Sequence, residues 1–304
     1  METIGRQATI VSIGFRQKTM PEIYDLVRAE AQVGSDVIVL YEACLGDDVV
    51  VSLDGPEVAQ ISQLAACYGT YIVFSVFRVG GPTGRVNSAI MFDRTGKIVG
   101  IYDKVFPYWS EFDLKPPASP GEDAPVIETD FGKVGMAICF DANFPEVFKR
   151  LSLGGAELVL WPSAYSAGMS LQAHAINYNF IIVTATMVPD CLVYDITGLE
   201  TYYQKGSQGG VNISRVTVDL DRCIFHENFN MSGRERLLKE HAGEIESDIW
   251  MQREQWFTLR ALKPGVSARD LAALHGLEDL RSYKSRSEKG IDKIRGYRFV
   301  GKTL

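Results

Sequence analysis

The sequence lacks any apolar run near the length of about 18 residues that a membrane-spanning helix requires. Its start, METIGRQATIVSIGF, has neither the basic opening nor the long apolar stretch of a secretory signal peptide. Its five cysteines are an odd number, and none is spaced C-x-x-C, which favours a reducing compartment over a disulfide framework. We therefore expect a cytoplasmic protein without a membrane partner.

Excess positive charge is also lacking, because the formal net charge of the 304 residues is -7. Nucleic acids and anionic membranes attract concentrated positive charge, so we expect no nucleic-acid partner. The exception is the range 281–304, where eight Lys or Arg stand against Glu288 and Asp292. A solvated surface arm is the ordinary interpretation of this basic end, and anion or nucleic-acid binding is the alternative.

Several common active-site motifs are missing as well. The sequence contains no G-x-S-x-G elbow, no P-loop and no G-x-G-x-x-G fingerprint. The four histidines lack the spacing of metal ligands: His174, His226, His241 and His275. We therefore expect neither a metal nor an organic cofactor.

What is present is the pattern of a layered α/β protein. Short β-branched runs alternate with helical patterns over the first two hundred residues. DVIVLY, ending at Tyr41, is apolar throughout, as expected of a strand covered on both faces, and Pro56 opens a helical pattern. After about Ser232 charged helical patterns take over. We predict a principal α/β domain over residues 1–231 and a helical extension over 232–304.

Two residues at strand ends are candidates for chemistry. Glu42 directly follows the buried strand, and Cys139 lies at a bend between a predicted strand and a predicted helix. Such a bend exposes the sulfur and points a helix N-terminus at it, which favours the thiolate. An isolated cysteine is nevertheless more often inert core packing. We keep that interpretation for the others: Cys44, Cys67, Cys191 and Cys223.

The residues around Cys139 read GKVGMAICFDANFPE, and LGGA and WPSA follow. Together they resemble the nucleophile segment of the nitrilase superfamily of carbon-nitrogen hydrolases, in its amidase-like branch. That family places a glutamate after an early buried strand and a lysine after a later one; here Glu42 and Lys104 stand in those places. The resemblance implies a four-layer αββα sandwich, a carbon-nitrogen hydrolase domain over residues 1–231, and a homo-oligomer of two or more subunits.

The resemblance also implies a role for each residue. Cys139 is the expected nucleophile, and Glu42 is the expected base, because a thiol is mostly protonated at neutral pH. Lys104 and the backbone N–H of Phe140 are expected to stabilise the negative charge that attack creates. Glu111 matches a second family glutamate and is expected to orient Lys104. An ordinary surface side chain is the alternative interpretation of Glu42, Lys104 and Glu111.

These roles predict the hydrolysis of a small amide through a thioester, releasing ammonia or an amine and a carboxylic acid. Asn143 stands where an arginine often precedes Phe-Pro-Glu, which disfavours a carbamoyl-amino-acid substrate. Phe140-Asp141 resembles the amidase branches more than the Trp-Glu pair of true nitrilases. A nitrilase, a carbamoyl hydrolase and an inactive scaffold protein with the same fold are the alternatives. Four aromatic residues are candidates for a pocket wall, with core packing as the alternative: Tyr108, Trp109, Trp161 and Tyr165.

Overall fold

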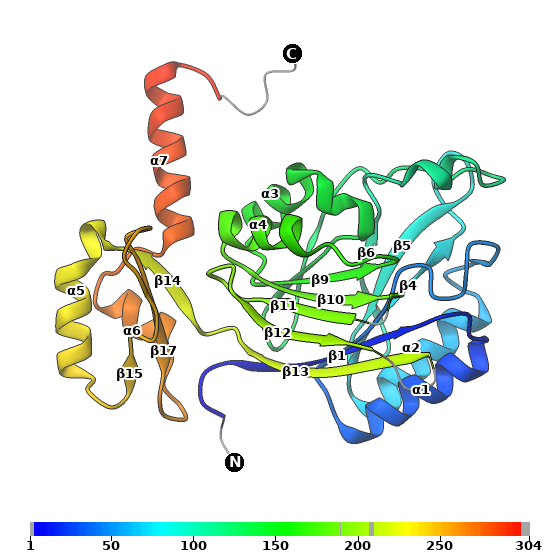
Figure 1. Cartoon of the computed structure of the whole chain (residues 1–304), viewed down its shortest axis with the longest axis horizontal. Coiled ribbons are helices and arrows are strands. Elements are labelled where there is room, and N and C mark those ends of the chain that lie inside the picture. The colour runs from blue at the N-terminus through cyan, green and yellow to red at the C-terminus, as the bar shows by residue number, and fades with distance from the viewer. Residues whose placement is uncertain (1–2, 189, 207–209, 299–304) are drawn as a thin grey trace. The chain divides into compact units, whose positions relative to one another are not determined.

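The computed structural model describes residues 3–188, 190–206 and 210–298, and it divides into two compact units (Figure 1). One unit runs from Ala8 to Val218, and the second joins the first seven residues to those from Asp219 onward. The chain thus enters the second unit earlier than the sequence pattern indicated, after residue 218 rather than 231. The reason is that a strand over residues 223–226 belongs to the second unit.

The first sheet of the 8–218 unit has the strand order β13-β1-β2-β4-β5-β6, with β3 paired to β4. β1, β2 and β4 are parallel, and β4, β5 and β6 form consecutive antiparallel hairpins. β2 is buried at every position, in keeping with its apolar sequence. The bounds are β1 Gln7–Phe15, β2 Val37–Leu40, β3 Val50–Val51, β4 Tyr71–Arg78, β5 Val86–Phe92, β6 Ile98–Asp103 and β13 Val211–Asp219.

The second sheet of this unit has the order β12-β11-β10-β9-β8-β7. Its central strands β8, β9 and β10 are parallel, and antiparallel strands flank them on both sides. The bounds are β7 Val126–Glu128, β8 Lys133–Met136, β9 Leu158–Ser163, β10 Ile181–Thr186, β11 Asp190–Tyr194 and β12 Glu200–Lys205.

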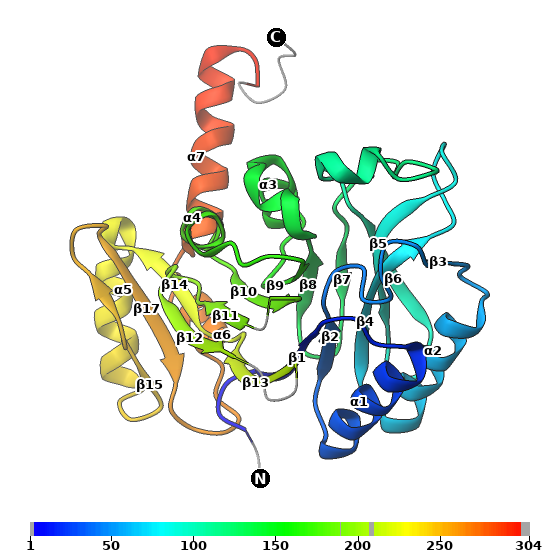
Figure 2. The ribbon, with the colours of Figure 1, turned by 45° about the vertical axis from the view of Figure 1, so that its right-hand side comes forward.

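Helices cover the outer face of each sheet. Figure 2 shows α1 (Met20–Val33) and α2 (Pro56–Tyr68) beside the first sheet, and α3 (Pro145–Leu153) and α4 (Gly168–Tyr178) beside the second. α1, α2 and α3 each have a proline in the first turn, where the missing N–H costs no hydrogen bond. The predicted four-layer αββα sandwich is confirmed.

The inner faces of the two sheets lie close together where β1 meets β10. A Cβ atom added to Gly14 would lie 2.0 Å from the carbonyl oxygen of Thr186. Nearby, the hydroxyl of Ser12 donates a hydrogen bond of 2.7 Å to the carbonyl oxygen of Thr184. The first sheet therefore needs glycine at residue 14 in order to pack on the second.

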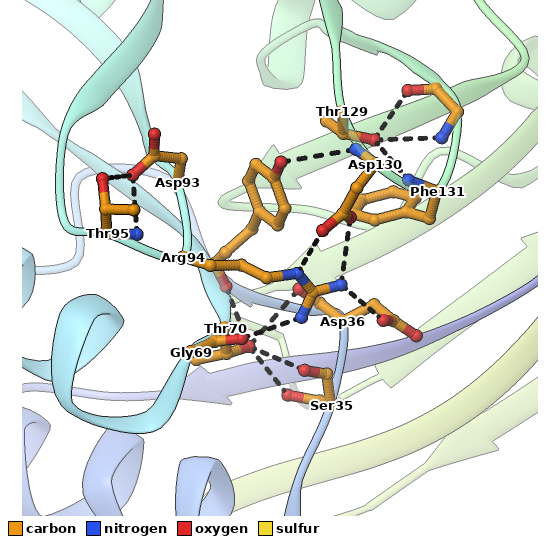
Figure 3. Close-up of polar contacts among 12 residues, drawn as sticks. Ser35, Asp36, Gly69, Thr70, Asp93, Arg94, Thr95, Thr129, Asp130 and Phe131 are labelled. Carbon is orange, nitrogen blue, oxygen red and sulfur yellow. Dashed lines mark hydrogen bonds and ion pairs between the residues drawn. The ribbon is translucent and has the colours of Figure 1, made fainter.

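An arginine in the β5–β6 turn also links the two sheets (Figure 3). Arg94 donates to Asp36, just before β2, at 2.7 Å and to the carbonyl oxygen of Gly69 at 2.8 Å, both in the first sheet's half of the sandwich. Its Nε donates to Asp130, in the β7–β8 turn of the second sheet, at 2.6 Å. One side chain thus connects turns that lead toward β2, β6 and β8.

The second unit combines helices with a small antiparallel sheet of order β14-β17-β15, with β16 paired to β17. The predicted helices are present, and Ser267 caps α6 by accepting a hydrogen bond from the backbone N–H of Asp270 at 3.1 Å. The sequence did not predict the sheet, because β15 and β16 have two residues each and leave no alternating pattern. The bounds are β14 Cys223–His226, β15 Ile245–Glu246, β16 Trp250–Met251, β17 Trp256–Ala261, α5 Glu227–Glu240, α6 Ala268–Leu274 and α7 Leu280–Arg295.

Most of the basic C-terminal end forms helix α7. Arg286 pairs with Glu278 at 2.7 Å, and Arg295 pairs with Asp292 at 2.8 Å, so part of the positive charge is locally compensated. Residues 299–304, which complete the basic end, lie outside the described residues. Within the described part of the chain, no helix is both long enough and apolar enough to cross a membrane.

Candidate active site

Three strand ends supply the candidate catalytic side chains. Glu42 lies two residues beyond β2, and Lys104 directly follows β6. Because β6 is two antiparallel steps from β4, it runs in the same direction as β2, and both strands end at the same edge of the first sheet. Cys139 follows β8 of the second sheet. The three residues border one cavity of about 980 Å³.

Lys104 lies between two carboxylates. Its side chain is 1% exposed, and its Nζ donates to Glu42 Oε1 at 2.7 Å and also to Glu111. Burial alone would lower the pKa of Lys104, but the charges of Glu42, Cys139 and Glu111 outweigh it and raise that pKa above its ordinary value. Lys104 is therefore a fixed, fully charged ammonium at neutral pH.

The Glu42 carboxylate is held from three sides. Besides Lys104, its Oε1 accepts a hydrogen bond from Asn87 Nδ2 at 2.9 Å, and its Oε2 accepts one from the backbone N–H of Ala164 at 2.9 Å. Asn87 also donates to Glu111 at 3.3 Å. Sequence reasoning missed Asn87, although a fully buried amide inside the apolar run VNSAIMF is itself a signal.

Cys139 begins a short 3-10 helix, η2 (Cys139–Asn143), and has a φ of 48°, in the left-handed region. A non-glycine residue rarely adopts this conformation unless its surroundings hold it there. Glu42 and Ser163 both lie near enough to the thiol to affect its pKa, Glu42 raising it and Ser163 lowering it. Burial, and then the charge of Glu42, raise the pKa of the Cys139 thiol far above its ordinary value. The resting thiol is therefore protonated.

Asp141 fixes the turn that contains Cys139. Its carboxylate accepts hydrogen bonds from the Tyr102 hydroxyl at 2.7 Å, the Ile138 N–H at 2.8 Å and the Phe106 N–H at 2.9 Å. Tyr102 and Phe106 flank Lys104 in the chain, so Asp141 joins the lysine segment to the cysteine turn. Burial raises the pKa of Asp141 to about 6.

Glu111 belongs to a second 3-10 helix, η1 (Trp109–Phe112). Besides contacting Lys104, its carboxylate accepts a hydrogen bond from the backbone N–H of Tyr108 at 3.1 Å. Desolvation raises the pKa of Glu111, and the neighbouring Lys104 opposes that rise. Glu111 thus contacts the Lys104 ammonium directly, and its role in orienting Lys104 stays a prediction.

The aromatic candidates differ in their positions. Tyr108 lines the cavity, whereas the other three, and also Phe140, are absent from its lining residues. Trp161 is fully buried in β9 and meets the Tyr165 ring at 5.6 Å, which is core packing. The Phe140 ring packs on Tyr108 at 5.1 Å, and Trp109 is 62% exposed.

The remaining cysteines and histidines form no further cluster of this kind. Cys44, Cys191 and Cys223 are buried, Cys67 is exposed, and Cys44 also borders the cavity. In the ranges that the structure describes, no group of three or more His, Cys, Asp or Glu side chains is arranged to hold a metal ion.

Comparison with known proteins gives a match to the family described as "Carbon-nitrogen hydrolase" over residues 6–223. Among curated proteins, the chain is 29% identical over 154 residues to the deaminated glutathione amidase of Yersinia enterocolitica, covering 44% of this chain and 53% of that protein. The chain thus matches about half the length of this relative.

Solved structures share the fold at low sequence identity. Nit3 of Saccharomyces cerevisiae, a member of branch 10 of the nitrilase superfamily, has a TM-score of 0.62 and 18% identity, covering 71% of this chain and 91% of that one. A mutant of the amidase from Nesterenkonia sp. AN1 has a TM-score of 0.61 and 20% identity, covering 72% and 92%. That structure contains the acetamide moiety of fluoroacetamide covalently added at the active-site cysteine.

Proposed function

The chain belongs to the carbon-nitrogen hydrolase family, and from that premise we propose that it hydrolyses a small amide with Cys139 as nucleophile, Glu42 as base and Lys104 as the fixed cation. One observation supports the proposal most directly. The Lys104 ammonium is 2.7 Å from Glu42, and Cys139 borders the same cavity, where the charge of Glu42 raises the pKa of the thiol. A nucleophile, a base and an electrostatic stabiliser together suffice for acyl transfer.

The first half-reaction forms a thioester. Glu42 takes the proton of the Cys139 thiol as the sulfur attacks the amide carbonyl carbon. The tetrahedral oxyanion is stabilised by the Lys104 ammonium and the backbone N–H of Phe140. Glu42 then returns the proton to the leaving nitrogen, the C–N bond breaks, and ammonia or an amine departs.

The second half-reaction restores the thiol. Glu42 takes a proton from water, and the hydroxide formed attacks the thioester carbonyl carbon. The same ammonium stabilises the second oxyanion, after which the C–S bond breaks and Cys139 regains a proton from Glu42. The acyl group leaves as a carboxylic acid. The raised pKa of the thiol supports this scheme, because proton removal has to be coupled to attack.

Two observations favour an amide as the substrate. The amidase from Nesterenkonia sp. AN1, which shares the fold, takes an acetamide moiety on its active-site cysteine. In this chain Phe140-Asp141 follows the cysteine, as in the amidase-like pattern, and Asp141 holds the turn through three hydrogen bonds. We therefore expect amides to be hydrolysed faster than nitriles and carbamoyl compounds, which the test includes for comparison.

The test measures ammonia release from a panel of amides, nitriles and carbamoyl compounds. We expect wild type to act best on an amide, and Cys139→Ala to lose essentially all activity. Cys67→Ala is the matched control, because Cys67 is exposed, and it should keep wild-type rates. Mass spectrometry of the quenched enzyme should find the acyl group on Cys139. Equal ammonia release by wild type and Cys139→Ala would rule out the mechanism.

We also propose a homo-oligomer of two or more subunits, as the family resemblance implies, and a cytoplasmic location, as the odd number of cysteines without C-x-x-C spacing favours. Light scattering on the purified full chain measures the oligomer mass. A monomer at all accessible concentrations would contradict this part without affecting the chemistry.

A further inference from the structure

A buried histidine is hydrogen-bonded to the turn that contains Cys139. His174 lies on α4 and is 7% exposed, and its Nε2 is 2.9 Å from the carbonyl oxygen of Ala142 in η2. A carbonyl oxygen can only accept a hydrogen bond, so Nε2 carries the hydrogen and donates it. Nδ1 is buried and has no hydrogen-bond partner among the described residues, as fits a neutral ring without a hydrogen on that nitrogen. Burial lowers the pKa of His174 and outweighs the opposing effect of this hydrogen bond, so the ring is uncharged at neutral pH.

Two aromatic rings fix the plane of this imidazole. The Phe148 ring, on α3, stacks on the His174 ring with the ring centres 3.8 Å apart and an angle of 9° between the planes. The Tyr178 ring, one turn further along α4, is stacked at 6.2 Å and 19°. Because an imidazole N–H lies in the plane of its ring, fixing the plane also fixes the direction of the Nε2–H bond. Packing therefore helps to hold the donor on the carbonyl oxygen of Ala142.

This hydrogen bond bears on the direction of the Phe140 N–H. In a helical turn the peptide dipoles lie nearly parallel to the axis, so the direction of one carbonyl is tied to that of the neighbouring N–H groups. Asp141 anchors the beginning of η2 by accepting a hydrogen bond from the Ile138 N–H at 2.8 Å. His174 holds the later part of η2 through Ala142. The N–H of Phe140, the proposed oxyanion donor, lies between these two contacts in the chain.

We propose that His174 is a positioning residue: through the carbonyl of Ala142 it holds the Cys139 turn so that the Phe140 N–H points at the developing oxyanion. The inference rests on the function proposed above. His174 is absent from the residues that line the cavity, so it acts through the turn rather than on the substrate. A donor stabilises the transition state only when it already points at the place that the oxyanion will take, and a misplacement of about 1 Å can cost about 100-fold in rate.

Two substitutions separate the hydrogen bond from the packing. His174→Phe keeps an aromatic ring that can stack but removes the donor, whereas His174→Gln keeps an N–H donor of similar reach and removes the stack. For the best amide, kcat should fall about 10-fold or more in His174→Phe, while KM stays within about 3-fold of wild type. His174→Gln should recover much of kcat, although urea unfolding should find it the less stable of the two variants. A role in packing alone predicts the reverse order of kcat, and that result would overturn the proposal.

Asn179→Gly is the matched control for a loss of stability. Asn179 follows α4, is 2% exposed and donates to the carbonyl oxygen of Ile196 at 3.1 Å. Its φ of 55° is one that glycine adopts readily, so the change removes the side-chain hydrogen bonds without straining the backbone. It should lower the free energy of unfolding and leave kcat at the wild-type value. The proposal is wrong if Asn179→Gly loses as much kcat as His174→Phe, or if kcat is unchanged in His174→Phe.

A second reaction tests the inference apart from amide hydrolysis. In p-nitrophenyl acetate the sulfur of Cys139 attacks the ester carbonyl, the thiol proton passes to Glu42, and p-nitrophenolate leaves from a tetrahedral oxyanion. The variants are made in a Cys67→Ala background, because Cys67 is exposed, and peptide mass mapping measures the acetyl group on Cys139. Acylation should be about 10-fold slower in His174→Phe and should recover in His174→Gln.

The two reactions together distinguish failure of the inference from failure of the function. The expected acylation pattern without turnover of any amide supports the inference and rejects only the proposed function. Turnover of amides by wild type, with kcat and acylation unchanged in His174→Phe, rejects only the inference.

Discussion

The Tyr102 hydroxyl donates a hydrogen bond of 2.7 Å to the Asp141 carboxylate, across the space between the two sheets. Tyr102 lies at the end of β6, two residues before Lys104, and Asp141 lies two residues after Cys139. Both side chains are fully buried. Together with the hydrogen bond from the Phe106 N–H, this contact therefore holds the cation of the first sheet in place relative to the thiol of the second.

Replacing Asp141 by Asn should lower both the stability of the fold and the rate of turnover. The amide loses the charge and has only one acceptor oxygen for three donors, so the free energy of unfolding should fall by about 2 kcal/mol or more. Turnover should fall as well, because the Cys139 turn loses its anchor. Urea unfolding and ammonia release measure the two effects. Asp25→Asn, on the exposed face of α1, is the control and should change neither.

The difference in unfolding free energy between wild type and Asp141→Asn should change with pH in a definite direction. Because the pKa of Asp141 is raised to about 6 in the fold, the folded protein binds a proton that the unfolded chain does not. The stabilisation that this bound proton gives the folded state is complete at a pH below the ordinary carboxyl pKa. It is lost as the pH rises through about 6. Relative to Asp141→Asn, wild type should therefore gain up to about 3 kcal/mol as pH falls from 7 to 4. A difference that is constant over this range would contradict the raised pKa.

Glu42→Gln should make Cys139 more acidic while stopping catalysis. Burial and then the Glu42 charge raise the pKa of the thiol, and removing the charge removes the second cause. The ultraviolet absorbance of thiolate, corrected with Cys139→Ala, should then show a larger ionised fraction at alkaline pH than in wild type. Glu111→Gln is the control, because Glu111 contacts Lys104, and it should shift the titration less. An unchanged titration in Glu42→Gln would show that the carboxylate does not act on the sulfur.

Arg94→Met should remove the link between the turns of the two sheets. The pair is partly exposed, with Arg94 at 30% and Asp130 at 53%, so we expect a loss of only about 1 kcal/mol in the free energy of unfolding. Asp130→Asn removes the ion pair of Arg94 with the second sheet, and Asp36→Asn removes its ion pair within the first sheet. Comparing the two variants separates the contributions of the two ion pairs to the free energy of unfolding. Arg28→Met is the control, because it breaks an exposed ion pair with Asp25 on α1. It should lower the free energy of unfolding by less than about 0.5 kcal/mol.

Gly14→Ala adds only one methyl group but should lower the free energy of unfolding strongly. The added Cβ would meet the backbone carbonyl oxygen of Thr186, which cannot move without shifting β10. We expect a loss of about 3 kcal/mol or more in urea unfolding. Gly290→Ala is the contrasting change, because no atom lies within 4 Å of a Cβ added there. Since alanine favours a helix over glycine, this change in α7 should raise the free energy of unfolding by up to about 1 kcal/mol. A tolerated alanine at residue 14 would mean that the sheets are less closely packed.

Much of this arrangement could be predicted from the sequence, for a physical reason. Apolar runs identify buried strands, and a polar residue directly after such a run lies at a sheet edge, which singled out Glu42 and Cys139. Their chemical roles stay predictions. Asn87 and Asp141 were not identified as supporting groups, because their importance depends on what faces them across the two sheets.

The aromatic residues show a different limit of sequence reasoning. Tyr108 and Trp161 both stand near the motifs, but only the direction of each side chain decides whether it borders a cavity or fills the core. The small sheet of the second unit was missed because its strands pair across charged helical segments, leaving little local signal.

The second unit contains an early segment of the chain. Ile4 bridges Pro264, and the backbone N–H of Arg6 donates to Asp219 at 2.9 Å. During synthesis on a ribosome the residues from 8 to 218 emerge with their partners, whereas the opening segment must wait until the chain has been made as far as Pro264. A shortened gene meant to yield the sandwich alone should therefore begin at Ala8, because Ile4 and Arg6 would be left without the neighbours they contact.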